Sequence, residues 1–155
     1  MRLYADTNLI VSLFVEGPNT AEAQRLYRSL DSGGNFTVPV SLLCRLEVVN
    51  ALQQTVFFTQ QGVPGMCVSR EYAMAAEAIF FEQVTEGTKF RSAQIDEILL
   101  ERQFHDLVHR HTAREGFRTY DILHVASALV LGCDTFWSFD AKAKKLARLE
   151  GLAVN

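Results

Sequence analysis

Two hydrophobic patterns alternate along the chain. Short apolar runs bounded by turn-forming residues predict strands over 2–6, 36–40, 135–139 and 152–154. Patterns typical of helices cover 9–15, 20–30, 42–58, 70–84, 93–114, 120–131 and 141–150. Because short apolar strands joined through helices form parallel sheets covered on both faces, the pattern predicts one α/β domain over residues 1–155.

Particular residues mark the ends of these helices. Gly33 and Gly34 are expected to close the helix over 20–30. Ser41 is expected to cap the N-terminus of the helix over 42–58. The apolar stripe of that helix is expected at Leu42, Leu46 and Val49.

The composition is that of an ordinary globular chain. Of its 155 residues, 48% are hydrophobic and 21% are charged, which excludes collagen-like, coiled-coil and disordered classes. No stretch reaches the ~20 apolar residues of a membrane span, and Asp6 interrupts any signal-peptide core. A cytoplasmic protein without membrane attachment is therefore expected. Cysteine spacing argues against a disulfide framework or a cysteine zinc site.

Four acidic residues occupy positions that suit a shared site. Asp6 ends the first predicted strand, and Asp140 directly follows the strand over 135–139. Because ligands of open parallel sheets collect at the carboxyl ends of the strands, we expect both carboxylates at one sheet edge. Glu47 lies one turn inside the helix after the second strand, and Asp121 lies in the first turn of the most apolar helix.

The surroundings of Glu47 and Asp121 favour a metal ion. No Lys or Arg stands at a spacing that obviously pairs with either acid. Carboxylates are rarely buried without a cation, and oxygen ligands suit Mg²⁺ or Mn²⁺. Two such ions about 3.5–4 Å apart are a recurring apparatus for cleaving phosphodiesters. The spacing therefore predicts a divalent-metal site.

Five motifs in order carry a resemblance to a known family. They are Tyr-Ala-Asp-Thr-Asn at 4–8, Leu-Glu-Val-Val-Asn-Ala-Leu at 46–52, Tyr-Asp-Ile-Leu-His-Val-Ala-Ser-Ala-Leu at 120–129, Phe-Trp-Ser-Phe-Asp at 136–140 and Leu-Ala-x-x-x-Gly-Leu at 146–152. With these motifs the chain resembles the PIN-domain ribonucleases, and within them the VapC-type toxins of toxin–antitoxin pairs. The motifs span nearly the whole chain.

The resemblance implies a fold, a site and an activity. The fold is a three-layer α/β/α sandwich with a central, mainly parallel sheet. Thr7, Asn8 and Ser138 match polar residues that support the site. The implied activity is metal-dependent endoribonuclease cleavage that leaves 5′-phosphate and 3′-hydroxyl ends. The implied ligands of the catalytic Mg²⁺ or Mn²⁺ are Asp6, Glu47, Asp121 and Asp140.

The resemblance also implies partners. A VapC-type chain is the toxin of a type II toxin–antitoxin module, so a cognate antitoxin and a homodimer are expected. In such toxins the helical region helps to bind the antitoxin or the second subunit. Our hypothesis for the interface residues is the aromatic set Phe57, Phe58, Phe80 and Phe81.

The charge distribution allows an RNA-binding surface despite a formal net charge of −3. Without the four proposed ligands, the remaining charge is −3 + 4 = +1. A solvated amphipathic helix explains the basic residues after Asp140 about equally well. The predicted RNA contacts are Arg118, Lys142, Lys144 and Lys145.

His124 lies one helical turn after Asp121. Because metal ions already activate the nucleophile, the site needs no general base. His124 is therefore predicted to be a packed or hydrogen-bonded structural residue.

Two alternatives to a toxin stay open. A housekeeping PIN-domain nuclease for RNA processing would carry the same acids. A catalytically silent PIN-like protein-binding module is the other, although a scaffold gains nothing from keeping uncompensated carboxylates together.

Overall fold

The computed structural model describes residues 2–30 and 36–155. Contacts among these residues divide the chain into a terminal unit (2–6 with 93–155) and a central unit (the described part of 7–92). Gly33 and Gly34, the expected end of one helix, lie outside the described residues. The single domain over 1–155 stays a prediction.

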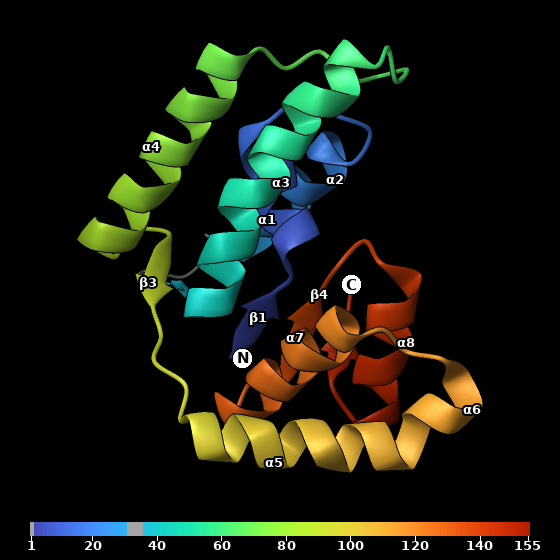
Figure 1. Cartoon of the computed structure of the whole chain (residues 1–155). Coiled ribbons are helices and arrows are strands. Elements are labelled where there is room, and N and C mark those ends of the chain that lie inside the picture. Colours follow the sequence, from blue (N-terminus) through green and yellow to red (C-terminus); the bar gives the residue numbers. More distant parts are fainter. Residues whose placement is uncertain (1, 31–35) are drawn as a thin grey trace. The chain divides into compact units, whose positions relative to one another are not determined.

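The terminal unit is built on a parallel sheet, as the sequence predicts. Its strands lie in the order β1-β4-β5, and both neighbouring pairs are parallel. Tyr4 of β1 lies opposite Phe136 of β4, which in turn lies opposite Val154 of β5. Figure 1 shows β1 beside β4. The strand bounds are β1 (Leu3–Ala5), β4 (Thr135–Trp137) and β5 (Ala153–Val154).

Helices α7 and α8 pack on each other and cover an apolar core in this unit. The rings of Tyr4 and Phe136 stack in this core with their centroids 5.7 Å apart. Helix α7 is buried almost all round, which explains its nearly continuous apolar sequence. The helices of this unit are α5 (Glu97–Leu107), the π-helical segment η2 (Val108–Thr112), α6 (Ala113–Glu115), α7 (Thr119–Val130) and α8 (Ala141–Leu149).

The predicted helix over 93–114 differs from the structure at its start and in the helix type of its last turns, whereas its end agrees to within one residue. It begins only at Glu97, because Asp96 caps it by accepting a hydrogen bond from the Leu99 N–H at 3.0 Å. Its last turns are π-helical and then α-helical before the chain leaves the helix at Gly116. Gly116 has a φ of +66°, a conformation that favours glycine and that ends the helix.

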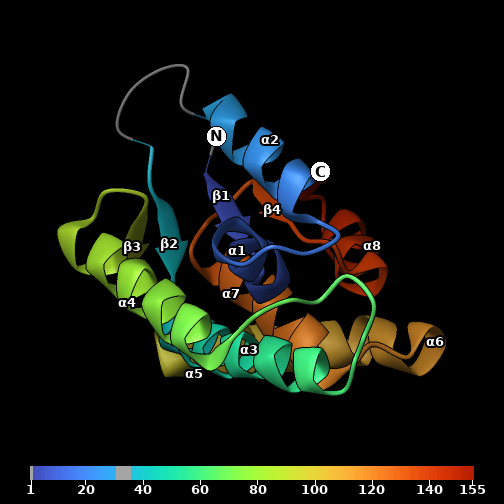
Figure 2. The same ribbon diagram turned by 90° about the horizontal axis from the view of Figure 1, so that it is seen from above.

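The central unit contains α1 (Thr7–Phe14), α2 (Thr20–Leu30), β2 (Val38–Val40), α3 (Leu42–Gln60), α4 (Arg70–Glu86) and β3 (Phe90–Ser92). Strand β2 pairs in parallel with β3, and Figure 2 shows the two strands side by side. The sequence did not predict β3, because in Phe-Arg-Ser only Phe90 is buried and no apolar run develops.

Helix α3 begins as predicted but turns a different face inward. Ser41 accepts a hydrogen bond from the Cys44 N–H at 3.2 Å, which confirms the cap. The predicted apolar stripe is wrong, because Leu42 and Leu46 are each 61% exposed. Both α1 and α4 pack against α3, and its buried residues are Cys44, Val48, Leu52, Thr55 and Val56.

The aromatic residues of the proposed interface differ in burial, since some lie in the core and others on the surface. Phe80 is fully buried and packs edge-on against Phe14 and Phe90, with ring centroids 5.8 Å and 5.5 Å away. Its assignment to an interface is therefore wrong. Phe57 and Phe58 are exposed and contact each other. Among the described residues, no helix combines the length and the apolar character needed to cross a membrane.

Candidate functional site

Asp6 and Asp140 lie at the same edge of the sheet of the terminal unit. Each follows the carboxyl end of its strand, and these strands, β1 and β4, are parallel neighbours. Ser138, which is fully buried, connects the two acids. Its hydroxyl donates to Asp6 Oδ2 at 2.7 Å and accepts from the Asp140 N–H at 2.9 Å. The predicted supporting residue thus links two predicted acids.

Asp6 is buried and is held at both carboxylate oxygens. Oδ2 accepts from Ser138, and Oδ1 lies 3.3 Å from Nε2 of His124. The other ring nitrogen of His124 forms a 2.9 Å hydrogen bond with the Tyr4 hydroxyl. These contacts confirm that His124 is a buried, hydrogen-bonded residue, and they fix the orientation of the Asp6 carboxylate.

Asp140 caps helix α8. Its Oδ1 accepts hydrogen bonds from the backbone N–H groups of Lys142 at 2.7 Å and Ala143 at 3.2 Å. A carboxylate at a helix N-terminus satisfies free N–H groups and interacts favourably with the helix dipole. These bonds fix one carboxylate oxygen by the backbone alone.

Asp121 is buried in the first turn of α7, and its carboxylate turns back toward the start of its own helix. Its Oδ2 accepts from the backbone N–H of Arg118 at 3.1 Å. This bond spans three residues at the helix start, in the spacing of a capping box. The backbone therefore places this acid in the same way as it places Asp140.

Arg118 joins Asp121 to Asp140. Its Nε lies 3.3 Å from Asp121 Oδ2, and its Nη2 donates to Asp140 Oδ2 at 2.8 Å. The expectation that no Lys or Arg is placed to pair with Asp121 is wrong, because the residue before the helix folds its side chain over the first turn. The hydrogen bond that Arg118 donates to Asp121 and the charges of both acids hold the pKa of Arg118 above its ordinary value. In the sequence, the spacing of three residues between Arg118 and Asp121 is the feature that could have indicated this ion pair.

Glu47 lies in the central unit and is half-buried in α3. Thr7, the residue after Asp6 in the chain, donates its hydroxyl proton to Glu47 Oε2 at 3.0 Å. Thr7 thus contacts one of the predicted acids, and its role in supporting the site stays a prediction. The backbone carbonyl of Asn8 accepts from the Ser12 hydroxyl at 2.8 Å. That Glu47 joins the other acids, and that Asn8 supports them, stay predictions.

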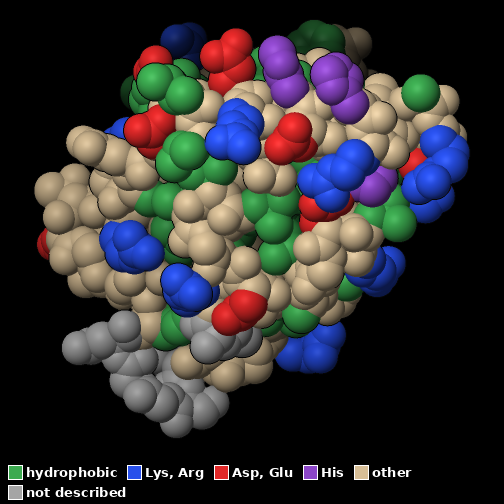
Figure 3. Space-filling model, turned by 90° about the horizontal axis from the view of Figure 1, so that it is seen from below, with side chains coloured by type: hydrophobic (Ala, Val, Ile, Leu, Met, Phe, Trp, Pro, Cys, Tyr) green, Lys and Arg blue, Asp and Glu red, His purple; other side chains and the backbone are tan. Residues whose placement is uncertain are grey.

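Two lysines of α8 contact other parts of the protein. Lys142 Nζ donates to the carbonyl of Gly116 at 3.0 Å, and Lys145 forms an ion pair with Glu115. Hydrogen bonds from Lys145 and Arg114 lower the pKa of the Glu115 carboxyl. Lys144 is half-buried. Figure 3 shows basic and acidic side chains intermixed on the face that it draws. A role in RNA contact stays a prediction for these lysines and for Arg118.

The carboxylates fit a divalent ion by their chemistry. Asp6, Asp121 and Asp140 offer the oxygen ligands that Mg²⁺ and Mn²⁺ prefer. As the described side chains stand, no group of three or more His, Cys, Asp or Glu is arranged to hold an ion. In this arrangement Arg118 forms ion pairs with Asp121 and Asp140.

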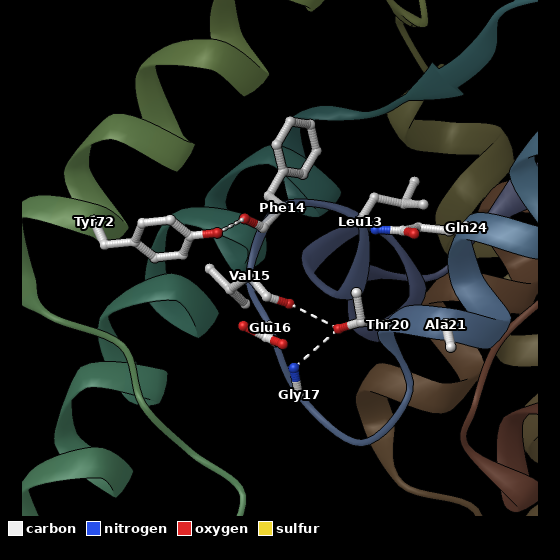
Figure 4. A pocket seen from close by; sticks show the side chains of 9 residues that line it. All are labelled: Leu13, Phe14, Val15, Glu16, Gly17, Thr20, Ala21, Gln24 and Tyr72. Carbon is white, nitrogen blue, oxygen red and sulfur yellow. Dashed lines mark hydrogen bonds between the residues drawn. The ribbon is translucent and has the colours of Figure 1, made fainter.

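A separate hollow lies in the central unit, where α1 leads into α2. Its volume is about 430 Å³. Figure 4 shows the Thr20 hydroxyl between the Val15 carbonyl and the Gly17 N–H, and the Tyr72 hydroxyl on the Phe14 carbonyl. These hydrogen bonds hold the turn that forms the wall of the hollow.

Several solved structures share this fold over almost the whole chain. VapC20 of Mycobacterium tuberculosis, a sarcin–ricin loop cleaving toxin, has a TM-score of 0.62 and 22% identity over 92% of this chain and 93% of its own. VapBC2 of Rickettsia felis, solved with a promoter DNA fragment, has a TM-score of 0.65 and 13% identity over 100% and 98%. The chain has a PIN-like α/β fold.

A third structure with this PIN-like fold is VapBC-1 of nontypeable Haemophilus influenzae. It has a TM-score of 0.64 and 14% identity over 100% of this chain and 97% of its own. No protein-family model and no curated protein sequence matches the chain. The fold class predicted from the sequence is thus confirmed by structure alone.

Proposed function

We propose that the protein is a divalent-metal-dependent endoribonuclease. The observation that carries the proposal is the set of three acids at the carboxyl edge of the sheet: Asp6, Asp121 and Asp140. Ser138 and Arg118 connect them through hydrogen bonds of 2.7–3.3 Å. Carboxylates that gather at this edge of a parallel sheet, two of them buried, are typical of a ligand site. That VapC20 is a loop-cleaving toxin of the same fold supports the choice of RNA as substrate.

The protein residues have distinct roles in this reaction. A Mg²⁺ or Mn²⁺ ion held by Asp6, Asp121 and Asp140 would supply the Lewis acidity that activates water and stabilises charge on the phosphate. Ser138 and His124 orient the Asp6 carboxylate. The N-termini of α7 and α8 fix Asp121 and Asp140. Glu47, oriented by Thr7, completes the site directly or through water.

The test is cleavage of RNA by the purified protein. We expect 5′-phosphate and 3′-hydroxyl ends in Mg²⁺ or Mn²⁺ and no cleavage in EDTA. Asp121→Asn should be inactive, whereas Asp106→Asn, which makes the same chemical change at an exposed position of α5, should cleave at the wild-type rate. Equal activity of the two variants would contradict the proposal.

We further propose that the protein is the toxin of a type II toxin–antitoxin module and forms a homodimer. The support is the fold shared with VapBC2 and VapBC-1 over nearly the full length of each chain. The experiment is a search for a small reading frame beside the gene, followed by co-expression of its product with this protein. We expect the two proteins to purify together and RNA cleavage to cease. Light scattering of the protein alone should give twice the monomer mass.

One observation favours a catalytically silent binding module as the second candidate. Arg118 compensates the charges of Asp121 and Asp140, so a scaffold can retain these carboxylates without an ion. The cleavage assay with Asp121→Asn and Asp106→Asn separates the two functions.

A further inference from the structure

The position of Arg118 is unusual for a residue that only caps a helix. Its guanidinium contacts two carboxylates from different helices, Asp121 of α7 and Asp140 of α8. These are two of the acids to which the proposed function assigns a divalent ion. A cation of the protein therefore occupies the place between these acids.

The carboxylates do not depend on the guanidinium for their positions. Asp121 keeps the hydrogen bond from the backbone N–H of residue 118, which every side chain except proline leaves intact. Asp140 keeps the N–H groups of Lys142 and Ala143. Both acids would therefore stay in place if the Arg118 side chain moved away.

The Arg118 side chain is also free to move without disturbing the core. It is 66% exposed, so little buried surface is lost when it leaves. Exposed ion pairs contribute little stability, while a divalent ion brings twice the charge of a guanidinium to the same carboxylates. An arginine stays protonated at all accessible pH values, so its attraction to the acids does not end by deprotonation of Arg118, whereas a competing cation on the acids can end it.

We propose that Arg118 is a displaceable counter-cation, which neutralises Asp121 and Asp140 in the ion-free protein and leaves them when a divalent ion binds. The inference rests on the proposed function, since it takes these acids as the ligands. After displacement the guanidinium is available to a phosphate of the substrate. Arg118 thereby sets how tightly the protein binds its metal.

The test is the affinity for Mn²⁺, measured by calorimetry on the full-length protein. We expect Arg118→Met to bind Mn²⁺ roughly three- to tenfold more tightly than the wild type, as the loss of mostly exposed ion pairs predicts. Arg118→Lys, which retains the charge, should restore an affinity close to that of the wild type. The matched control is Arg114→Met, since Arg114 is also 66% exposed and pairs with Glu115. It should bind Mn²⁺ like the wild type.

A second readout follows the side chain itself. In the ¹⁵N NMR spectrum, the Nε–H signal of Arg118, assigned by its loss in Arg118→Lys, should shift on addition of Mg²⁺. The Arg114 signal should not shift. A shift that saturates at the calorimetric affinity supports displacement.

The outcomes separate the inference from the function on which it rests. If Arg118→Met binds Mn²⁺ as the wild type does, or more weakly, the displacement is refuted and the metal site stands. If neither protein binds Mn²⁺, the inference fails together with the proposed metal dependence. If Arg114→Met tightens binding as much as Arg118→Met, net charge is the cause and Arg118 has no special role.

Discussion

Helices α7 and α3 each carry a predicted acid, but they place it by different means. Asp121 lies in the first turn of α7 and bonds to the backbone at the start of its own helix. Glu47 lies farther inside α3, and its carboxylate accepts a hydrogen bond from the hydroxyl of Thr7 in α1. An acid in a first turn is thus fixed by local structure, whereas one farther along needs a partner from another element.

The same pair of helices differs in how a hydrophobic sequence is buried. Helix α7 is buried on nearly every side, so almost any apolar stripe chosen from its sequence lies inside. Helix α3 buries Cys44, Val48 and Leu52 and exposes Leu42 and Leu46. Both sets have the spacing of one helix face, so packing against α1 and α4 decides between them.

Of the substitutions considered, Asp121→Asn should have the largest effect on the rate of RNA cleavage. Removing this backbone-fixed carboxylate should lower the rate of RNA cleavage by roughly 10²-fold or more, the scale for removing a group that stabilises transition-state charge. Mn²⁺ binding should weaken in parallel. The far-ultraviolet circular dichroism should stay that of the wild type, because an Asn side chain can still accept the Arg118 N–H. A fully active variant would show that Asp121 is only a capping residue.

Leu52→Ala and Leu46→Ala sharpen the comparison of helix faces. Leu52 is fully buried, so its truncation should lower the free energy of unfolding by about 2–5 kcal/mol. Leu46 is exposed on the same helix and should change it by less than about 0.5 kcal/mol. Urea denaturation of both variants gives the values. Equal losses would mean that the exposed stripe is covered in solution.

Glu47→Gln should affect activity less than Asp121→Asn. We expect a loss of about 10- to 100-fold in cleavage rate, the range for residues that hold a metal through water or orient its ligands. Thr7→Val should produce part of the same loss, because it removes the hydroxyl that bonds Glu47. If Glu47→Gln lowers the cleavage rate as much as Asp121→Asn does, Glu47 is a direct ligand of the metal ion.

The smallest expected effect is the pH dependence of the Glu115 ion pairs. The pKa of Glu115 is lowered in the folded protein, so its contribution is present above the unfolded pKa of about 4.3 and is lost as the pH falls through the folded value. The stability difference between wild type and Glu115→Gln should therefore shrink below about pH 4.3. A difference that is constant from pH 6 to pH 3 would contradict the pairing with Lys145 and Arg114.

Local signals in the sequence determine most of the fold. The helix over 20–30 has its predicted bounds, Ser41 and Asp140 cap helices, and the strands β1 and β4 lie parallel as expected. These features depend on capping residues and apolar runs, which act over a few positions. Strand β3 escaped prediction because Phe-Arg-Ser contains no apolar run, and only Phe90 of the three residues is buried.

The candidate site could be predicted in part. Asp6 and Asp140 were expected at one sheet edge, because strand ends determine where they lie. The link through Arg118 was missed, since it depends on a side chain that folds back over a helix start and reaches a second helix. The burial of Phe80 likewise depends on Phe14 and Phe90, which arrive from distant segments.

The central claim is that carboxylates at the sheet edge cleave RNA with a divalent ion. Its most direct test is RNA cleavage by wild type and Asp6→Asn, each in Mn²⁺ and in EDTA, with both proteins purified free of host nucleases. The account predicts cleavage by the wild type in Mn²⁺ only, and none by Asp6→Asn in either condition. Metal-dependent cleavage by Asp6→Asn at the wild-type rate would contradict it.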